Sequence, residues 1–395
     1  MPYKSIRDLE LAGKRVFIRV DFNVPLDETG TQITSDTRIR AALPTIKLAL
    51  EKGAAIILAS HLGRPKGKPN PKMQLDPAAA RLGELLGREV KKAPDCVGPE
   101  VRRLASELSS GGVLLLENLR FHAGEEANER AFAGQLAGLC GVYINDAFGA
   151  AHRAHASTAG MAALAPEAAA GLLMEKELKY LSMAVSKPER PYIAIVGGAK
   201  ISGKIGVLRS FLKLADKVLI GGAMTYTFLK ARGVAIGSSL VEDEKLGVAR
   251  EAMDLGGDKL LLPIDHVIAA DLAADAETKV VDGTNEPIPA GWKGLDIGPL
   301  TIAAYREAIS SARMIVWNGP MGVFEIEPFA AGTMAVARAV ADSAATSIVG
   351  GGDSEKAIQN AGVSDRITHI STGGGASLEF LAGEKLPGVE ALGGL

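Results

Sequence analysis

Ser371-Thr372-Gly373-Gly374-Gly375-Ala376-Ser377 follows a short apolar run that ends at Ile370 and precedes a helical pattern that begins at Leu378. Glycine has no side chain to shield its backbone N–H group, and it adopts the positive φ angles that other residues disfavour. A helix that starts here directs its unpaired N–H groups and the positive end of its dipole at the same space. The stretch therefore predicts a strand-to-helix junction that binds an anion, most naturally phosphate. The alternative is a glycine turn without a ligand, and this stretch alone does not distinguish the two.

Short apolar runs alternate with helical patterns along the 395-residue chain, whose length suggests two or three domains. The first half predicts strands at 15–20, 54–59, 113–116 and 142–144, with a helix at 39–52. The second half predicts strands at 192–196, 217–220, 259–262, 313–317, 347–349 and 368–370, with helices that include 205–214 and 331–343. Continuous apolar strands in strand–helix–strand order indicate parallel sheets covered on both faces. The sequence therefore predicts an α/β fold with two doubly wound domains of mainly parallel sheets, plus an antiparallel excursion within 267–288.

Between the two halves, a charged helical pattern at 175–187 is ended by Pro188 and Pro191. We expect an inter-domain helix and hinge at 173–190, a first domain at 1–172 and a second domain at 191–382. Folds of this class bind ligands at the carboxyl ends of their strands, so the residues just after each strand are the candidates for function.

Composition argues against several classes of protein. The formal net charge of −2 gives no bulk electrostatic attraction for nucleic acid or an anionic membrane. Cys96 and Cys140 form no CxxC or zinc spacing, which indicates buried thiols in a reducing compartment. The N-terminus lacks the apolar core of a signal peptide, and no uncharged apolar run reaches spanning length. We therefore expect a cytoplasmic protein.

Positively ionisable side chains recur after the predicted strands of the first half. They are Arg38, His61, Arg64, Arg120, His152, Arg153 and His155, and we call them the basic rim. Arginine suits bidentate binding of phosphate and carboxylate. For any single residue the alternative is a solvated arginine or a hydrogen-bonded structural histidine. Recurrence of four arginines at one topological position favours an anion site.

Glycine follows the strands of the second half instead. Gly197-Gly198-Ala199-Lys200 follows the first of them, and Lys204 lies four residues further, on the same helix face. The Walker spacing is absent, but glycines followed by lysine at a helix start are typical of phosphate binding. Asp353, beside glycines at another helix start, is a candidate Mg²⁺ ligand, with a helix N-cap as the alternative. The pattern favours a small polyanion on the first domain, a nucleotide on the second, and phosphoryl transfer between them.

Seven segments carry a resemblance to a known family. They are Arg19-Val20-Asp21-Phe22-Asn23-Val24-Pro25, Ser60-His61-Leu62-Gly63-Arg64-Pro65, Glu117-Asn118-Leu119-Arg120-Phe121, Ala151-His152-Arg153-Ala154-His155, Gly197-Gly198-Ala199-Lys200, Trp317-Asn318-Gly319-Pro320-Met321-Gly322-Val323-Phe324-Glu325, and Gly351-Gly352-Asp353-Ser354 with Thr372-Gly373-Gly374-Gly375. In this order and spacing, from about residue 15 to residue 387, the chain resembles phosphoglycerate kinase. One departure is Gly203, where the family commonly has Asp.

The resemblance implies transfer of a phosphoryl group between 1,3-bisphosphoglycerate and ADP, giving 3-phosphoglycerate and ATP, by a monomer that uses Mg²⁺. It implies substrate binding by Asp21, Asn23, Arg38, His61, Arg64, Arg120 and Arg153. It implies nucleotide binding by Lys204, Gly294, Asn318, Glu325, Gly351, Gly352, Asp353 and Ser354, with Lys200 near the transferred group. It also implies that the C-terminal segment 383–395 completes the first domain.

The chemistry implied here needs no general base, because a carboxylate that titrates near pH 4 is already ionised at pH 7. The remaining requirement is to bring two anions together and to stabilise the charge of the transferred group. We expect Arg38, Lys200, Mg²⁺ and the helix start at Gly374 and Gly375 to do this. In-line transfer then requires hinge closure near 175–191 and 383–388.

Three other classes of protein fit the sequence less well. A nicotinamide dehydrogenase should carry GxGxxG after its first strand, where this chain has Asp21-Phe22-Asn23-Val24-Pro25. A two-lobed solute-binding protein would also close on a hinge, but it would not require glycine-rich and lysine-rich strand ends, and it would bind no ADP or ATP. A scaffold has no positive support in the sequence.

Overall fold

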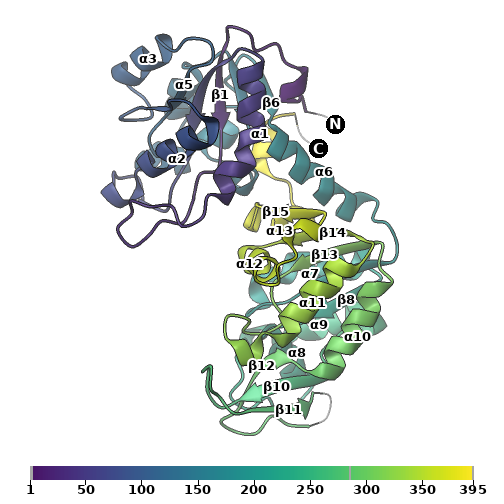
Figure 1. Cartoon of the computed structure of the whole chain (residues 1–395). Coiled ribbons are helices and arrows are strands. Elements are labelled where there is room, and N and C mark those ends of the chain that lie inside the picture. Colours follow the sequence, from purple (N-terminus) through teal and green to yellow (C-terminus); the bar gives the residue numbers. More distant parts are fainter. Residues whose placement is uncertain (1–2, 284–285, 394–395) are drawn as a thin grey trace. The chain divides into compact units, whose positions relative to one another are not determined.

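The computed structural model describes residues 3–283 and 286–393, and it divides into two compact units (Figure 1). Unit 1 comprises Met1–Lys179 with Lys385–Leu395, and unit 2 comprises Tyr180–Glu384. Helix α6 (Leu172–Ser186), which lies where the sequence predicts the connection, contributes residues to both units. Within the described ranges, none of the helices combines the length and apolarity needed to cross a bilayer.

Unit 1 contains a six-stranded sheet in the order β3-β4-β2-β1-β5-β6, and all its pairs are parallel. The strands are β1 (Arg15–Arg19), β2 (Ala55–Ala59), β3 (Lys91–Lys92), β4 (Val113–Leu115), β5 (Val142–Asn145) and β6 (Ala168–Ala170). The helices are α1 (Thr37–Glu51), α2 (Asp76–Leu86), α3 (Pro99–Ser106), α4 (Ala123–Glu126), α5 (Arg130–Ala137) and α14 (Pro387–Glu390). The four strands predicted from apolar runs are confirmed, whereas β3 and β6 were not predicted.

The core of unit 1 follows from its sequence periodicity. Helix α1 buries Ile39, Ala42, Ile46 and Ala49, a spacing of three or four residues that places them on one face. This face belongs to the same apolar cluster as the strands of the sheet. The sheet is therefore fixed in place, and the carboxyl ends of β1, β2, β4 and β5 meet at one edge.

Unit 2 contains a second six-stranded parallel sheet, in the order β15-β14-β13-β7-β8-β9. Its strands are β7 (Tyr192–Val196), β8 (Lys217–Ile220), β9 (Leu260–Leu261), β13 (Met314–Asn318), β14 (Thr346–Gly350) and β15 (His369–Ser371). Its helices are α7 (Ile205–Leu214), α8 (Met224–Ala231), α9 (Leu246–Gly256), α10 (Pro299–Ser310), α11 (Ala331–Asp342), α12 (Gly352–Asn360) and α13 (Gly375–Leu381). The predicted doubly wound, mainly parallel architecture is confirmed.

A separate three-stranded antiparallel sheet has the order β11-β10-β12. Its strands are β10 (Asp265–Ala269), β11 (Thr278–Asp282) and β12 (Lys293–Ile297). Pairing of β10 with β11 confirms the antiparallel excursion expected within 267–288, of which 284–285 lie outside the described residues. Strand β12 was not predicted, because its sequence Lys-Gly-Leu-Asp-Ile has no continuous apolar run.

The C-terminal segment packs within unit 1. The Gly388 N–H group donates to the Ala151 carbonyl at 2.8 Å, and Asn145 Nδ2 donates to the Gly388 carbonyl at 3.2 Å. A Cβ atom at Gly388 would lie 3.0 Å from Ala151 Cα, so a larger residue would separate the two backbones. Glycine thus permits the close approach that holds helix α14 beside the end of β5.

Candidate active site

The carboxyl edge of the unit 1 sheet gathers Asp21 after β1, His61 after β2, and Arg120 after β4. Arg153 and His155 follow β5 at the same edge. The topology therefore brings the strand-end residues of the basic rim together, as parallel pairing predicts.

Asp21 and Arg38 form the central pair of this edge. Arg38 Nη1 donates to Asp21 Oδ2 at 2.6 Å, and the Asn23 N–H group donates to Asp21 Oδ1 at 3.1 Å. Burial alone would raise the pKa of Asp21, but the Arg38 and Arg19 guanidinium groups and the Asn23 N–H group outweigh it and hold that pKa below its usual value. Asp21 is therefore a carboxylate that holds Arg38 over the strand end.

Arg19 lies on β1 with its side chain fully buried, and it was not predicted as a site residue. Its Nε donates to Ser157 Oγ at 2.9 Å, its Nη1 donates to the Val20 carbonyl at 2.5 Å, and its Nη2 lies 3.2 Å from His61 Nδ1. The signal was available, since a charged residue in an otherwise buried apolar strand must find partners. Ser157 Oγ in turn donates to Glu125 Oε1 at 2.6 Å, so Arg19 connects two segments behind the rim.

The histidines of the rim are held neutral. Burial lowers the pKa of His61 well below its usual value, and the Arg19, Arg120 and Arg38 cations lower it further against the opposing charge of Asp21. Burial and the neighbouring arginines likewise lower the pKa of His155 to about 4. A neutral imidazole at pH 7 donates and accepts hydrogen bonds without adding charge to the crowded rim.

Arg120 carries positive charge that its surroundings compensate only in part. Its Nη1 donates to the Gly63 carbonyl at 2.8 Å and its Nε lies 3.4 Å from Glu126, but Nε has no hydrogen-bond partner among the described residues. Burial lowers its pKa, which Glu126 opposes, while the Arg19 and Arg153 cations lower it further. Like charges that crowd one another are stabilised by an anion placed between them.

Two further predicted residues are Asn23, in the loop after β1, and Arg64, in the loop after β2. Asn23 Oδ1 accepts the Gly63 N–H group at 2.8 Å, so Asn23 shapes this loop. Arg64 is exposed and forms no hydrogen bond or ion pair within the described part of the chain.

His152 Nε2 accepts from Arg153 Nε at 3.1 Å, which orients Arg153.

In unit 2, Lys204 lies between two strand ends. It belongs to the short 3₁₀ turn Ser202–Lys204, and its Nζ donates to the Gly197 carbonyl at 2.6 Å, to the Asn318 carbonyl at 3.1 Å and to Asn318 Oδ1 at 2.5 Å. Asn318 Nδ2 then donates to the Gly350 carbonyl at 2.8 Å. Burial lowers the pKa of Lys204 to about 8, against the opposing charge of Asp353.

Two helix N-termini lie at the ends of the adjacent strands β14 and β15. Gly351, with φ +93°, is the N-cap of α12, and Gly374, with φ +51°, is the N-cap of α13. Neither cap forms a side-chain hydrogen bond to the helix. Because β14 and β15 are parallel neighbours, both helix starts present backbone N–H groups at the same edge.

The glycines at these strand ends serve two different purposes. A Cβ atom at Gly197 would lie 2.1 Å from the Pro320 carbonyl oxygen, and one at Gly222 would lie 2.4 Å from the Gly198 nitrogen, so these glycines allow loops to pack together. At Gly352 and Gly374 a Cβ atom would meet nothing within 4 Å. Backbone that is open to a ligand is therefore limited to a subset of these glycines, which includes those at the α12 and α13 starts.

Asp353 lies in the first turn of α12 and is exposed. It is not the N-cap of this helix, because Gly351 occupies that position. The Asp353 side chain forms no hydrogen bond or ion pair in the described ranges, so its carboxylate oxygens are accessible to a cation. A single carboxylate fits Mg²⁺, which is usually held by one or two carboxylates together with substrate phosphates and water. Ser354 is buried, and its Oγ accepts the Gly319 N–H group at 2.6 Å.

Three predicted residues lie apart from this hydrogen-bonded cluster. Lys200 and Glu325 are exposed on loops and contact none of the cluster residues through a hydrogen bond within the described part of the chain. Gly294 lies on β12, where a Cβ atom would fall 1.9 Å from the Tyr226 hydroxyl. The contact with Tyr226 is by itself enough to require glycine at this position.

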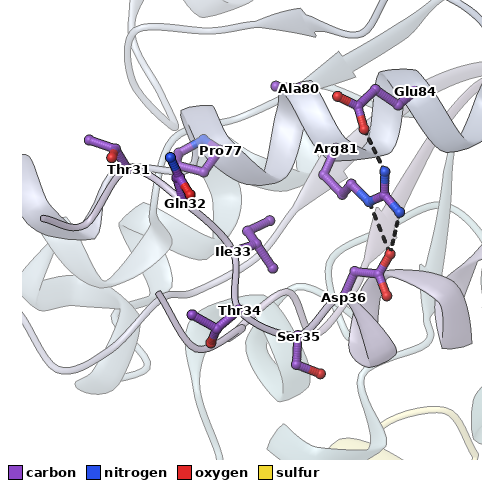
Figure 2. Close-up of a pocket in the computed structure, with 10 residues that line it drawn as sticks. All are labelled: Thr31, Gln32, Ile33, Thr34, Ser35, Asp36, Pro77, Ala80, Arg81 and Glu84. Atoms are coloured by element: carbon purple, nitrogen blue, oxygen red, sulfur yellow. Dashed lines mark hydrogen bonds and ion pairs between the residues drawn. The ribbon is translucent and has the colours of Figure 1, made fainter. Parts of the chain in front are cut away.

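A cavity of about 640 Å³ lies elsewhere in unit 1, between the loop 31–36 and helix α2 (Figure 2). The guanidinium group of Arg81, which lines this cavity, is already neutralised by two carboxylates. Its Nη2 lies 2.8 Å from Asp36 Oδ2, and its Nη1 lies 2.5 Å from Glu84 Oε2. No residue of the basic rim lines it. This cavity is therefore separate from the predicted site residues.

The chain is similar to known proteins in both sequence and fold. The family model described as phosphoglycerate kinase matches residues 6–384. A phosphoglycerate kinase of Solibacter usitatus is 62% identical over 395 residues, covering 99% of this chain and 100% of the relative, and one of Acidobacterium capsulatum is 58% identical over 398 residues, covering 98% of each. The structure of phosphoglycerate kinase from Coxiella burnetii superposes with a TM-score of 0.89 at 42% identity, covering 99% of both chains. The enzyme from Pyrococcus horikoshii gives a TM-score of 0.87 at 37% identity, covering 98% of both.

Proposed function

The chain belongs to the phosphoglycerate kinase family, and from that premise we propose that unit 1 binds the phosphoglycerate and unit 2 binds the nucleotide. The activity of this family is reversible transfer of a phosphoryl group between 1,3-bisphosphoglycerate and ADP, which gives 3-phosphoglycerate and ATP in glycolysis. The observation that carries the proposal is the incompletely compensated positive charge around Arg120, at the edge where Asp21 positions Arg38.

For the acceptor, the basic rim offers several cations to a phosphate and a carboxylate. Arg120 and Arg153 repel one another in the free protein, and an anion between them would remove that repulsion. Arg64 supplies an exposed guanidinium group that no protein partner competes for within the described ranges. Neutral His61 would donate a hydrogen bond to the carboxylate of the glycerate, and the carboxylate of Asp21 would accept one from its hydroxyl group.

For the nucleotide, the α12 and α13 starts would direct backbone N–H groups at its phosphates. Lys204 and Asn318 set the spacing between the ends of β7 and β13. Glu325 and Gly294 would contact other parts of the nucleotide. Asp353 would hold Mg²⁺, which when bound supplies charge neutralisation to the phosphates.

The transfer itself is a matter of positioning and charge. The acceptor carboxylate is already ionised at neutral pH, so no histidine is needed as a base to deprotonate it. Arg38 would act on the acceptor side and Lys200, with Gly374 and Gly375, on the donor side, where they stabilise charge on the transferred oxygens.

Because the proposed acceptor and nucleotide residues belong to different units, we propose that the units close on their ligands through hinges near 175–191 and 383–388. Such closure would exclude water and make in-line transfer possible. We further propose that the protein acts as a cytoplasmic monomer, in keeping with the glycolytic role of the family.

A calorimetric titration of 3-phosphoglycerate alone, without nucleotide, tests the assignment of the acceptor to unit 1. Arg120→Met should weaken binding of 3-phosphoglycerate by at least about tenfold, since it removes a charge-assisted contact. The same variant should bind Mg-ADP with the wild-type affinity. Loss of ADP affinity, with 3-phosphoglycerate affinity retained, would refute the assignment.

A further inference from the structure

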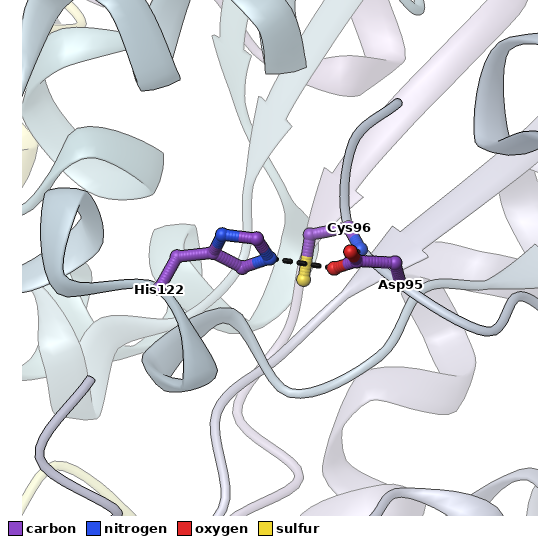
Figure 3. Close-up of side chains that lie close together, drawn as sticks. All are labelled: Asp95, Cys96 and His122. Atoms are coloured by element: carbon purple, nitrogen blue, oxygen red, sulfur yellow. Dashed lines mark hydrogen bonds and ion pairs between the residues drawn. The ribbon is translucent and has the colours of Figure 1, made fainter. Parts of the chain in front are cut away.

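Three side chains with metal-binding atoms meet on unit 1, away from Asp21 and Arg38. Asp95 and Cys96 follow the edge strand β3, and His122 lies between the 3₁₀ turn Leu119–Phe121 and helix α4 (Figure 3). A carboxylate oxygen of Asp95, the Sγ atom of Cys96 and a ring nitrogen of His122 all lie within 4.8 Å of one another. Figure 3 shows these groups pointing toward one another from two separate segments.

We propose that Asp95, Cys96 and His122 form a binding site for Zn²⁺, with water as the fourth ligand. The site is distinct from the Mg²⁺ that accompanies the nucleotide and rests on none of the assignments made for the reaction.

The geometry is close to what zinc requires. Zn–S bonds near 2.3 Å and Zn–N or Zn–O bonds near 2.0–2.2 Å, in a tetrahedron, place ligand atoms roughly 3.3–3.7 Å apart. His122 Nε2 and Asp95 Oδ1 are 2.5 Å apart, so they would separate by roughly 1 Å to admit the ion. Both residues are partly exposed, at 29% and 50% of their side-chain surface, and can make that adjustment.

The third ligand and the orientation of the ring are held in place. Cys96 is fully buried, and its Sγ–H group donates to the Glu117 carbonyl at 2.9 Å. The His122 ring stacks on Phe132, with centroids 4.9 Å apart and an interplanar angle of 25°. A fixed sulfur at the base, a histidine ring whose orientation is set by stacking, and a carboxylate at the surface leave a solvent-facing position for water.

Charge also favours a cation here. The negative charges of Asp95, Glu125 and Glu117 act on Cys96, and the positive charge of Lys92 opposes them. Lys92 Nζ is itself paired with Glu117 Oε2, at 2.6 Å. Zinc binding would replace the S–H bond with a Zn–S bond and release one proton to solvent. Thiolate and imidazole ligands select zinc over magnesium, which prefers oxygen ligands.

The first experiment uses Co²⁺ as a spectroscopic substitute for Zn²⁺, added to the reduced, chelator-treated full-length protein. We expect saturation at one Co²⁺ per chain, with a sulfur-to-cobalt charge-transfer band in the near ultraviolet, and displacement by Zn²⁺ but not by excess Mg²⁺. Cys96→Ser should abolish the band. Cys140→Ser, which removes the other buried free cysteine, should leave it unchanged. Absence of the band in the wild-type protein, or its persistence in Cys96→Ser, would overturn the proposal.

The second experiment does not depend on the buried position. Asp95→Asn and His122→Gln alter the partly exposed ligands, and each should weaken calorimetric Zn²⁺ binding by at least about tenfold. Both variants should keep wild-type turnover in chelator-treated, Mg²⁺-supplemented buffer, because neither residue belongs to the proposed reaction machinery. Unchanged Zn²⁺ affinity in both variants would show that the ion binds elsewhere and would refute the site.

Discussion

Arg38 Nη1 lies 2.6 Å from Asp21 Oδ2, and this ion pair joins the first helix of unit 1 to the end of its central strand β1. The Arg38 side chain keeps about a third of its surface exposed, whereas Asp21 is nearly buried. The carboxylate therefore fixes a guanidinium group that stays partly exposed, as is needed to stabilise charge on a bound anion.

Replacement of Arg38 should affect the reaction more than nucleotide binding. Arg38→Ala removes a donor proposed to act on the transferred group, so we expect kcat to fall about 10²–10³-fold, as for loss of one preorganised donor. The KM for ATP should change less than about threefold. Arg40→Ala is the matched control, because Arg40 lies on the same helix but pairs with Asp36. Near-normal kcat in Arg38→Ala would exclude the proposed role.

Lys200 offers the corresponding test on unit 2. Its side chain is exposed and forms no hydrogen bond within the described residues, so its removal should leave the free energy of unfolding within about 0.5 kcal/mol of wild type. Turnover of Lys200→Ala should nevertheless fall at least tenfold, with a smaller change in the Kd for ATP. Steady-state kinetics and a nucleotide titration measure both quantities. A variant that keeps wild-type turnover would contradict the assignment.

Lys204 should make stability depend on pH in a defined direction. Burial lowers its pKa to about 8 in the folded protein, whereas an unfolded lysine titrates near 10.4. Between these values the unfolded chain binds more protons than the folded one, so rising pH stabilises the fold, while below pH 8 the cost of burying the charge is fully present. From pH 7 to pH 9.5 the wild-type free energy of unfolding should therefore rise relative to Lys204→Met, by roughly 1–3 kcal/mol.

Chemical denaturation at the two pH values measures this difference. Lys213→Met, at an exposed position of helix α7, controls for a general effect of lysine removal and should track the wild type. A difference between wild type and Lys204→Met that stays constant with pH would show that Lys204 titrates alike in both states.

Two glycines with open surroundings should respond differently to substitution. Gly374 has φ +51°, so Gly374→Ala should destabilise by about 1–3 kcal/mol and lower turnover, although nothing lies within 4 Å of the new Cβ. Gly203 has equally open surroundings without a left-handed φ. Gly203→Asp, which restores the residue common in the family, should change stability by less than about 0.5 kcal/mol. Equal effects of the two substitutions would argue against a conformational role for Gly374.

Much of the fold could be predicted because the central strands are buried on both faces. Strands such as β7 (Tyr192–Val196) and β2 (Ala55–Ala59) are fully buried and appear in the sequence as unbroken apolar runs. The edge strands give no such signal. Strand β3 consists of Lys91 and Lys92, and β6 is three alanines, so both form because a neighbouring strand offers a hydrogen-bonding edge.

The site was predicted less completely, because several residues are fixed by contacts that sequence spacing does not reveal. Arg19 was overlooked although it binds Ser157, His61 and the Val20 carbonyl. Gly197 was interpreted as part of a phosphate-binding stretch, whereas it allows loops to pack. By contrast, the glycines that open α12 and α13 could be found from sequence, since a helix start after a strand exposes its own N–H groups.

Hydrogen–deuterium exchange with one ligand at a time shows whether each unit binds a different substrate. Addition of 3-phosphoglycerate alone should slow amide exchange at 60–64, 118–122 and 151–155, which include every residue of the basic rim except Arg38. Addition of Mg-ADP alone should slow it at 197–204, 318–322, 351–354 and 373–376. Protection of the unit 2 segments by 3-phosphoglycerate alone, or of the unit 1 segments by Mg-ADP alone, would contradict the account.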